Sequence, residues 1–407
     1  MAYHGRMRRD ELVELLSPEG LRLLDSLDGY RSDDLVRAVA RLRAAGHSPV
    51  LVAAVLTQAR LRQKAEAKFG EFARSMLFTD AGLEQATRLR VAALHAGRFA
   101  AAGAAHVADL GSGIGGDALA LAAIDLAVTA VEADEVTATL ASFNLAPFPA
   151  ASAVHSTAEA FDLDGFDAVY LDPARRTAGH RETRRLDDPD DYSPSLDFAF
   201  GLAEHLPVGV KVGPGFDRDR LPRDAEAQWV SVDGELVETG LWFGALARPG
   251  VRRSALLLGA AGSSELTAAG DSEDEEVGPL GAFVHEPDGS AIRARLLGEL
   301  ARSSGSRMLS PSIAYLTGDE AAASPFLRSF RVLAELPLDE RTLAKELRTR
   351  GVGVLEIKKR GVDIDPARFR KRLGLSGTGS AVLILTRIAG RHRALLAERV
   401  ERPAPAQ

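Results

Sequence analysis

A glycine-rich turn between an apolar run and a helical pattern restricts the fold more than any other feature of the sequence. The apolar run His106–Leu110 leads into Gly-Ser-Gly-Ile-Gly-Gly at residues 111–116, and a helical pattern follows from Ala118. Glycines at such a turn allow positive φ angles and a close approach of the backbone to a ligand. Further short apolar runs, separated by helical patterns, follow at residues 128–132, 153–155, 166–172 and 208–212. This alternation predicts a doubly wound α/β domain, with a mostly parallel sheet between two layers of helices.

Changes of pattern along the 407 residues divide the chain into five segments. Residues 1–99 carry apolar side chains at helical spacing, which predicts an N-terminal helical domain with helix starts at Ser17-Pro18 and Ser48-Pro49. Residues 100–258 hold the α/β domain, whose sheet we expect to end in an antiparallel edge because Asp233-Gly234 is typical of a hairpin. In the next segment, residues 262–278 are rich in Gly, Ser and acidic residues and are expected to form a solvated loop or linker. The third segment, residues 259–325, contains this linker and a small α+β segment. The fourth, residues 326–401, is expected to form a second small α+β domain, and the fifth, residues 402–407, a disordered tail.

The composition excludes several classes of protein. With 46% hydrophobic and 26% charged residues, the chain resembles an ordinary globular protein and neither a disordered nor a fibrous one. The absence of cysteine excludes disulfides, thiolate metal sites and a cysteine nucleophile, and the nine histidines show no spacing typical of a metal site. No apolar stretch is typical of a signal peptide or a membrane span, so we expect a cytoplasmic protein without a membrane or metal partner.

The residue before the glycine turn indicates the charge of its ligand. Gly111, Gly113 and Gly116 alone also fit a dinucleotide-binding turn. Asp109 stands two positions before the first glycine, where its carboxylate would repel a diphosphate. The same carboxylate would attract a ligand that carries an ammonium or a sulfonium group.

Two more acidic residues stand where predicted strands end. Glu132 closes the second apolar run, where a carboxylate can accept hydrogen bonds from both ribose hydroxyls of a nucleoside. The alternative is that Glu132 or Asp134 caps the following helix. Asp172 ends the fourth apolar run within Asp-Pro-Ala-Arg, and the carboxyl ends of parallel strands line the binding crevice of such sheets. We therefore expect Asp172 opposite the glycine turn, beside the reacting group, unless this run is only a strand-terminating turn.

Positive charge is concentrated near the C-terminus. The whole chain has a net charge of −7, but Arg328 to Arg399 contains 17 Lys and Arg against 8 Asp and Glu. The run Lys358-Lys359-Arg360 and the basic residues after it are expected to contact phosphates, which would make binding depend on salt. The alternative interpretation is an ordinary solvated surface.

These motifs resemble the class I S-adenosylmethionine-dependent methyltransferases over about residues 100–250, with residues 109–117 similar to their first motif and residues 172–175 to their fourth. Residues 330–399 resemble the THUMP-like domain that follows such enzymes in bacteria. The resemblance implies a Rossmann-like sheet and S-adenosylmethionine as cofactor, a molecule with both an ammonium and a sulfonium group. It implies cofactor binding by Asp109, Gly111, Ser112, Gly113, Gly115, Asp117, Glu132 and Ala133, catalysis by Asp172, Pro173 and Arg175, and substrate binding by Arg176, Lys358, Lys359 and Arg360.

The reaction expected from this resemblance is methylation of a base nitrogen in transfer or ribosomal RNA, because THUMP domains present RNA to an attached enzyme. Ala174 and Arg175 replace the proline and the aromatic residue that amino-methylating enzymes commonly have, so base stacking at that position is in question. The absence of cysteine excludes the cysteine-dependent methylation of pyrimidine carbon 5. The alternatives are a catalytically silent protein that binds S-adenosylmethionine and RNA, a methyltransferase of proteins or small molecules, and a nicotinamide-dependent enzyme that uses the same turn.

Overall fold

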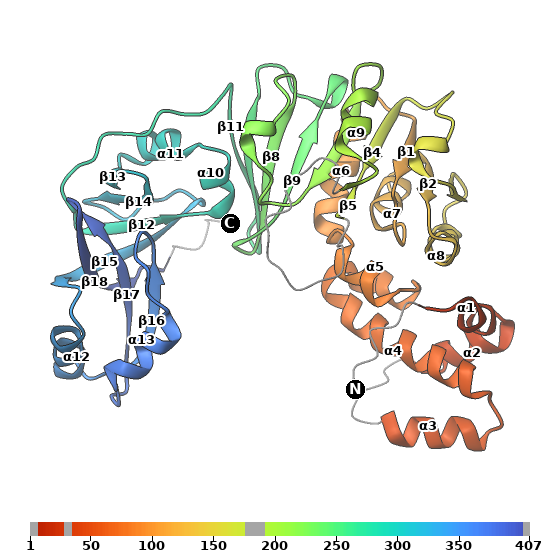
Figure 1. Ribbon diagram of the computed structural model, residues 1–407, viewed down its shortest axis with the longest axis horizontal. Helices are drawn as coiled ribbons and strands as arrows, with labels where there is room; N and C mark the ends of the chain where they lie inside the picture. The colour runs from red at the N-terminus through yellow and green to blue at the C-terminus, as the bar shows by residue number, and fades with distance from the viewer. Residues whose placement is uncertain (1–6, 28–34, 176–191, 402–407) are drawn as a thin grey trace. The chain divides into compact units, whose positions relative to one another are not determined.

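The computed structural model describes residues 7–27, 35–175 and 192–401, and the chain divides into two compact units (Figure 1). Unit 1 contains the chain up to Val212 together with Trp242–Ala247. Unit 2 contains Gly213–Leu241 and the chain from Arg248 onward. The N-terminal helices therefore belong to the same unit as the glycine turn.

Unit 1 begins with helices, as predicted. The Ser17 and Ser48 hydroxyls accept hydrogen bonds from the backbone N–H groups of Gly20 and Leu51, each at 3.0 Å, and a proline follows each serine. Both predicted helix starts are confirmed. The helices before the sheet are α1 (Arg9–Leu15), α2 (Pro18–Asp25), α3 (Leu35–Ala44), α4 (Pro49–Phe69), the 3-10 helix η2 (Gly70–Arg74), α5 (Asp80–Gln85) and α6 (Leu89–Ala101).

The sheet of unit 1 has five parallel strands in the order β7-β4-β1-β2-β3. The chain runs from β1 outward to β3 and then returns to β4 on the other side of β1, which places the topological switch point between β1 and β4. This order confirms the predicted doubly wound α/β domain. The elements are β1 (His106–Leu110), α7 (Gly116–Ala122), β2 (Ala127–Glu132), α8 (Glu135–Leu145), β3 (Ala151–His155), η3 (Ala158–Ala160), β4 (Ala168–Leu171), β5 (Ala174–Arg175), β6 (Tyr192–Ser193), α9 (Leu196–Leu202), β7 (Val208–Val212) and η6 (Gly244–Leu246).

One hydrophobic core joins the N-terminal helices to this sheet. Phe69, Phe78 and Phe99 are fully buried and share a cluster with Ile114 of the glycine turn. A Cβ on Gly82 would lie 2.6 Å from Ile114 Cγ2, so α5 packs directly against the turn. Burial of each aromatic ring stabilises the fold by roughly 1.5–3 kcal/mol, which makes this core a substantial support for the turn.

Unit 2 begins with a hairpin and an edge strand. Asp233 and Gly234 have φ angles of 52° and 83°, as a two-residue hairpin turn requires, and they connect β8 (Glu226–Val232) to β9 (Glu235–Trp242). β10 (Arg253–Gly259) lies parallel to β8, and β11 (Gly262–Ala268) pairs antiparallel with β10. The prediction of a loop over 262–278 is wrong for Gly262–Ala268. The strand escaped prediction because it is an edge strand of polar and small residues, without a continuous apolar run.

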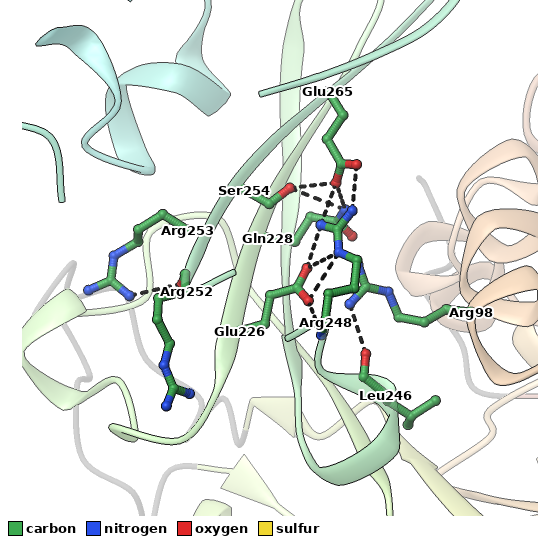
Figure 2. Close-up of polar contacts among 9 residues, drawn as sticks. All are labelled: Arg98, Glu226, Gln228, Leu246, Arg248, Arg252, Arg253, Ser254 and Glu265. Carbon is green, nitrogen blue, oxygen red and sulfur yellow. Dashed lines mark hydrogen bonds and ion pairs between the residues drawn. The ribbon is translucent and has the colours of Figure 1, made fainter. Parts of the chain in front are cut away.

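An ion-pair network secures this edge strand. Arg248 donates to Glu226 Oε1 at 2.6 Å and to Glu265 Oε2 at 2.6 Å, and Glu265 Oε1 also accepts from Ser254 and Gln228, each at 2.7 Å (Figure 2). The side chain of Glu226 has no exposed surface. A buried carboxylate is stable only when its oxygens are paired, and here Arg248 supplies the pairing.

The rest of unit 2 forms one seven-stranded sheet in the order β13-β14-β12-β15-β18-β17-β16. Two small α+β modules were expected at residues 259–325 and 326–401, but strands from both ranges lie in this one sheet. Successive residues Val382, Leu383, Ile384 and Leu385 alternate between two separate hydrophobic clusters, so both faces of β17 are covered. The elements are η5 (Arg218–Arg220), β12 (Phe283–Pro287), α10 (Gly289–Arg293), α11 (Leu297–Ser304), β13 (Arg307–Ser310), β14 (Ile313–Gly318), β15 (Leu327–Pro337), α12 (Glu340–Thr349), β16 (Val352–Lys359), α13 (Pro366–Leu373), β17 (Gly379–Ile388) and β18 (Arg391–Arg399).

Candidate active site

The glycine turn connects β1 to α7 in a conformation that only glycine adopts easily. Gly111, Gly113 and Gly115 have φ angles of 81°, 55° and 82°. The N–H groups of Gly111 and Ser112 both donate to Val131 O, at 2.8 and 3.0 Å, which ties the turn to β2. A Cβ placed on Gly113 would meet nothing within 4 Å, so the turn opens into space there. The backbone at Gly113 is therefore accessible to a ligand.

Glu132 supports the turn from the end of β2. Its carboxylate accepts from Gly113 N at 3.0 Å through Oε2 and from Asp134 N at 2.8 Å through Oε1. Asp134 caps α8 by accepting from Thr137 N at 3.0 Å, so the helix-capping alternative is correct for Asp134 and not for Glu132. A carboxylate has about four acceptor positions, so these two contacts leave Glu132 able to accept from a ligand hydroxyl. The neighbouring Ala133 is exposed, and its carbonyl oxygen lies 3.1 Å from His155 Nε2.

Asp109 is buried beneath the turn, with an exposed fraction of 1%. Neither of its carboxylate oxygens has a hydrogen-bond partner among the described residues. Burial raises the pKa of Asp109 well above its ordinary value, and the negative charges of Asp117 and Asp172 raise it further. The nearby Ala118 N–H and Lys211 oppose this rise only in part. Asp109 is thus a buried acid whose charge the protein balances only in part.

Asp117, in the first turn of α7, is instead fully engaged by N-terminal residues. Its Oδ2 accepts from the Thr87 hydroxyl at 2.7 Å, and its Oδ1 lies 3.1 Å from His95 Nδ1. The Tyr170 hydroxyl of β4 lies 3.1 Å from the same histidine nitrogen. Burial alone would raise the pKa of Asp117, but the hydrogen bonds and charges of His95, Lys211 and Thr87 hold it below its ordinary value.

Asp172 lies at the carboxyl end of β4, beside the glycine turn. Its carbonyl oxygen would be 3.6 Å from a Cβ on Gly111, which confirms that the fourth-strand motif and the turn lie side by side. Lys211 of β7 forms an ion pair with Asp172 Oδ2 and donates to the Thr87 hydroxyl at 3.0 Å. Pro173 is buried next to Asp172. Asp109, Asp117, Asp172 and Lys211 therefore act on one another electrostatically.

The segment after Pro173 forms a short two-stranded ladder. Ala174 pairs with Ser193 and Arg175 with Tyr192, in antiparallel register. Pro194 then returns to the turn, with its Cδ 3.7 Å from the position of a Cβ on Gly111. The predicted substrate residue Arg176 and the predicted tail at 402–407 lie outside the described residues.

The basic run in β16 and after it has mixed surroundings. Lys358 is largely buried, with Nζ 2.7 Å from Glu286 and 5.4 Å from the centre of the Phe330 ring. Lys359 is exposed, and the Arg360 guanidinium lies 5.3 Å from the centre of the Tyr315 ring. Of these three cations, Lys359 is the most accessible to a ligand.

Sequence reasoning did not predict Lys211, Thr87, His95 or Tyr170. Lys211 gave a usable signal, because a lysine inside the apolar run Val-Gly-Val-Lys-Val needs a buried partner or an exit to solvent. Thr87 and His95 gave none, since their role depends on how α6 packs against α7.

Two structural properties bear on metal binding and on membrane insertion. Within residues 7–27, 35–175 and 192–401, no group of three or more His, Cys, Asp or Glu side chains is arranged to hold a metal ion. In the same ranges, no helix has both the length and the apolar character needed to span a membrane.

Comparisons with known proteins show the class of enzyme and support the fold. Residues 327–399 match the family model of a THUMP domain-like module, and residues 8–65 match a domain of unknown function (DUF8688). Uncharacterized S-adenosylmethionine-dependent methyltransferases from two strains of Mycobacterium tuberculosis are each 33% identical to this chain over 356 residues, covering 86% of this chain and 95% of theirs. The crystal structure of a proposed methyltransferase from Porphyromonas gingivalis superposes with a TM-score of 0.71 at 21% identity, covering 91% of this chain and all of that one. The first two relatives rule out the nicotinamide alternative, and the chain belongs to the S-adenosylmethionine-dependent methyltransferases that carry a C-terminal THUMP-like domain.

Proposed function

We propose that this enzyme methylates a base nitrogen in RNA, either transfer or ribosomal RNA. The observation that carries the proposal is the pairing of two features in unit 1: an open glycine turn above an unpartnered buried acid, and an acid at the adjacent strand end that Lys211 holds in place. The first feature suits the cofactor and the second suits a nitrogen acceptor.

The residues of the turn fit S-adenosylmethionine. Within the part of the chain that the structure describes, the two buried oxygens of Asp109 have no hydrogen-bond donor, and an ammonium group of the cofactor would satisfy them. Gly111, Ser112, Gly113 and Gly115 would give the ligand access to the backbone, and Glu132 and Ala133 would contact the ribose. Asp117 would act indirectly, because its oxygens already bind Thr87 and His95. The bound cofactor supplies a methyl group that its sulfonium has already activated.

Asp172 would orient the acceptor nitrogen. Its carboxylate would accept a hydrogen bond from the N–H of the base, direct the nitrogen lone pair toward the methyl group, and take up the proton that the nitrogen loses as the N–C bond forms and the S–C bond of the cofactor breaks. Lys211 fixes Oδ2 and thereby the plane of that carboxylate. Pro173 fixes the backbone beyond Asp172, and Arg175 and Arg176 would hold a nearby phosphate. Orientation of donor and acceptor can supply as much as about 7–11 kcal/mol of a reaction barrier, so this site needs no covalent intermediate.

The C-terminal domain supports RNA as the acceptor. Residues 327–399 match a THUMP domain-like family model and lie within the basic part of an otherwise acidic chain. Lys359 and Arg360 would contact phosphates, while Lys358 would support them from its ion pair with Glu286. A methyltransferase of proteins or small molecules would have no evident use for this charge.

The test is methyl transfer from labelled S-adenosylmethionine to total RNA from a strain that lacks the gene, compared with RNA from its parent. We expect label only in RNA from the deletion strain, because the parent's RNA is already methylated. Asp172→Ala should abolish transfer, and Asp164→Asn, on an exposed loop, should retain it. Absence of label in both RNA samples, with label in the protein or small-molecule fraction, would refute RNA as the acceptor.

A further inference from the structure

Three arginines of unit 2 belong to two segments that are in contact, because Arg293 donates to Phe216 O at 3.0 Å, two residues before Arg218. Arg218 belongs to η5, in the loop that follows β7, and Arg293 and Arg295 lie at the end of α10 and just after it. The positive charges of Arg295 and Arg293 act on Arg218, and burial and these charges lower its pKa. Asp271 and Asp219 oppose this repulsion.

Few donors of Arg293 and Arg295 have acceptors among the described residues. Among the described residues, the Arg293 guanidinium makes one hydrogen bond, from Nη2 to Phe216 O at 3.0 Å, and its Nε is buried without an acceptor. Arg295 reaches Asp271 only at 3.9 Å. Asp271 is already held by Arg253 at 2.7 Å, so it cannot fully neutralise the other arginines.

Arg248, in the same unit, is an example of an arginine with a purely structural role. Its Nε, Nη1 and Nη2 all donate to Glu226 or Glu265 at 2.6–3.2 Å (Figure 2). Burial lowers the pKa of Arg248, but these two carboxylates raise it above its ordinary value overall, the opposite of the change at Arg218. The comparison separates a paired arginine from a group that still needs an anion.

The backbone at Arg295 is held in an unfavourable conformation. Its φ angle is 59°, in the left-handed region that side chains other than glycine rarely adopt. Ser272 holds it there, because its N–H and its hydroxyl both donate to Arg295 O, at 2.9 and 3.0 Å. Strain of this kind is often retained where it positions a functional side chain.

We propose that Arg218, Arg293 and Arg295 form a binding site for backbone phosphates of the RNA substrate, separate from the THUMP-like domain. The proposal rests on the proposed RNA methyltransferase function. Guanidinium groups bind phosphate oxygens in two-pronged geometry, and three of them together suit a polyanion better than a single carboxylate. The loop that carries Arg218 follows directly on β7, whose Lys211 holds Asp172.

The test compares binding of two fluorescein-labelled probes, unfractionated bacterial transfer RNA and bacterial ribosomal RNA, by full-length variants over a range of salt concentrations. Arg218→Gln with Arg293→Gln should weaken binding by about tenfold per arginine, and the slope of log K against log salt should decrease by roughly 0.7–0.9 per lost contact. Arg302→Gln is the matched control, because Arg302 lies on the adjacent α11 but is paired with Glu275 and Glu299. It should change the affinity less than twofold.

Arg295→Gly distinguishes loss of binding from loss of fold. Glycine adopts the left-handed conformation readily, so this variant should melt no lower than the wild type and yet bind RNA about tenfold more weakly. If the wild type binds RNA but the arginine variants bind as well as Arg302→Gln, the phosphate site is wrong and the proposed function stands. If the wild type binds no RNA, both proposals are wrong.

Discussion

The strongest test of the cofactor site is the replacement of Asp109 by Asn. Asp109 is 1% exposed, and neither of its oxygens has a hydrogen-bond partner among the described residues. Burial raises its pKa, and the charges of Asp117 and Asp172 raise it further. In the cofactor-free protein this side chain is therefore a cost to the fold. Asn keeps the shape of Asp but removes the charge, so Asp109→Asn should make the cofactor-free protein more stable.

The size of the effect follows from the missing hydrogen bonds. An unsatisfied buried polar group costs about 1–3 kcal/mol, and Asn recovers the part of this cost that comes from the charge. At about 2–4 °C per kcal/mol, we expect the melting temperature at pH 8 to rise by roughly 2–12 °C. The pKa in the folded state lies above that of the unfolded chain, about 3.9, so the wild type loses stability as the pH rises above that value. The advantage of the variant should therefore grow with pH and be smallest near pH 4.

The assay is thermal unfolding with and without S-adenosylmethionine. At a ligand concentration of about 100 times the Kd, the wild type should gain about 2.7 kcal/mol, and the variant should gain much less because the ammonium group of the ligand loses its partner. Asp164→Asn removes an exposed carboxylate and should change stability by less than about 0.5 kcal/mol. If Asp109→Asn melts below the wild type without ligand at pH 8, Asp109 has a protein partner and the reasoning fails.

Three further predictions concern the groups around the site and one buried histidine in unit 2. Lys211→Met should lower kcat at least about tenfold, or about 1.4 kcal/mol, because Lys211 orients Asp172. The affinity for S-adenosylmethionine should stay unchanged within twofold. Steady-state kinetics that show only a weaker cofactor affinity would contradict this prediction. Thr87→Val should destabilise the protein by about 1.5–3 kcal/mol in urea titrations, because Asp117 Oδ2 loses a hydrogen bond. Thr139→Val, at a partly exposed position of α8, should cost little. Burial lowers the pKa of His285 to about 4, below the value of about 6.5 in the unfolded chain. Its contribution to folding stability, at most about 3 kcal/mol, is therefore fully present above pH 6.5 and is lost as the pH falls toward 4. His285→Gln should remove that pH dependence, and an unchanged pH profile of unfolding would refute the assignment.

The sequence was sufficient to predict the strands that carry the site. A buried parallel strand is a short apolar run, and the acid or glycine that ends it is local in the chain, so Asp109, Glu132 and Asp172 could be placed at strand ends without a structure. Their convergence follows from the rule that parallel strands share one carboxyl edge. The division into five segments and the roles of the individual site residues remain predictions.

Other features depend on contacts between distant parts of the chain. The bonds from Thr87 and His95 to Asp117 span 30 and 22 residues, and Lys211 lies 124 residues from Thr87. No local pattern encodes such pairs. The strand β11 was missed for a related reason: its polar residues are held by β10 and by Arg248, and not by an apolar face of their own.

Charged residues with a role in binding differ from charged residues that only stabilise the fold in whether their hydrogen bonds are satisfied within the protein. Arg248 and Glu226 satisfy each other, and such a pair can often be replaced by apolar residues without loss of stability. Asp109 and the group Arg218, Arg293 and Arg295 have unmet hydrogen bonds or unbalanced charge. Folding stability alone would select against both, since each costs free energy in the isolated protein. Their persistence is explained if a ligand's ammonium group binds Asp109 and phosphates bind the three arginines. Substitutions at these positions should then raise stability and weaken binding. Substitutions in the Arg248 network should affect stability alone.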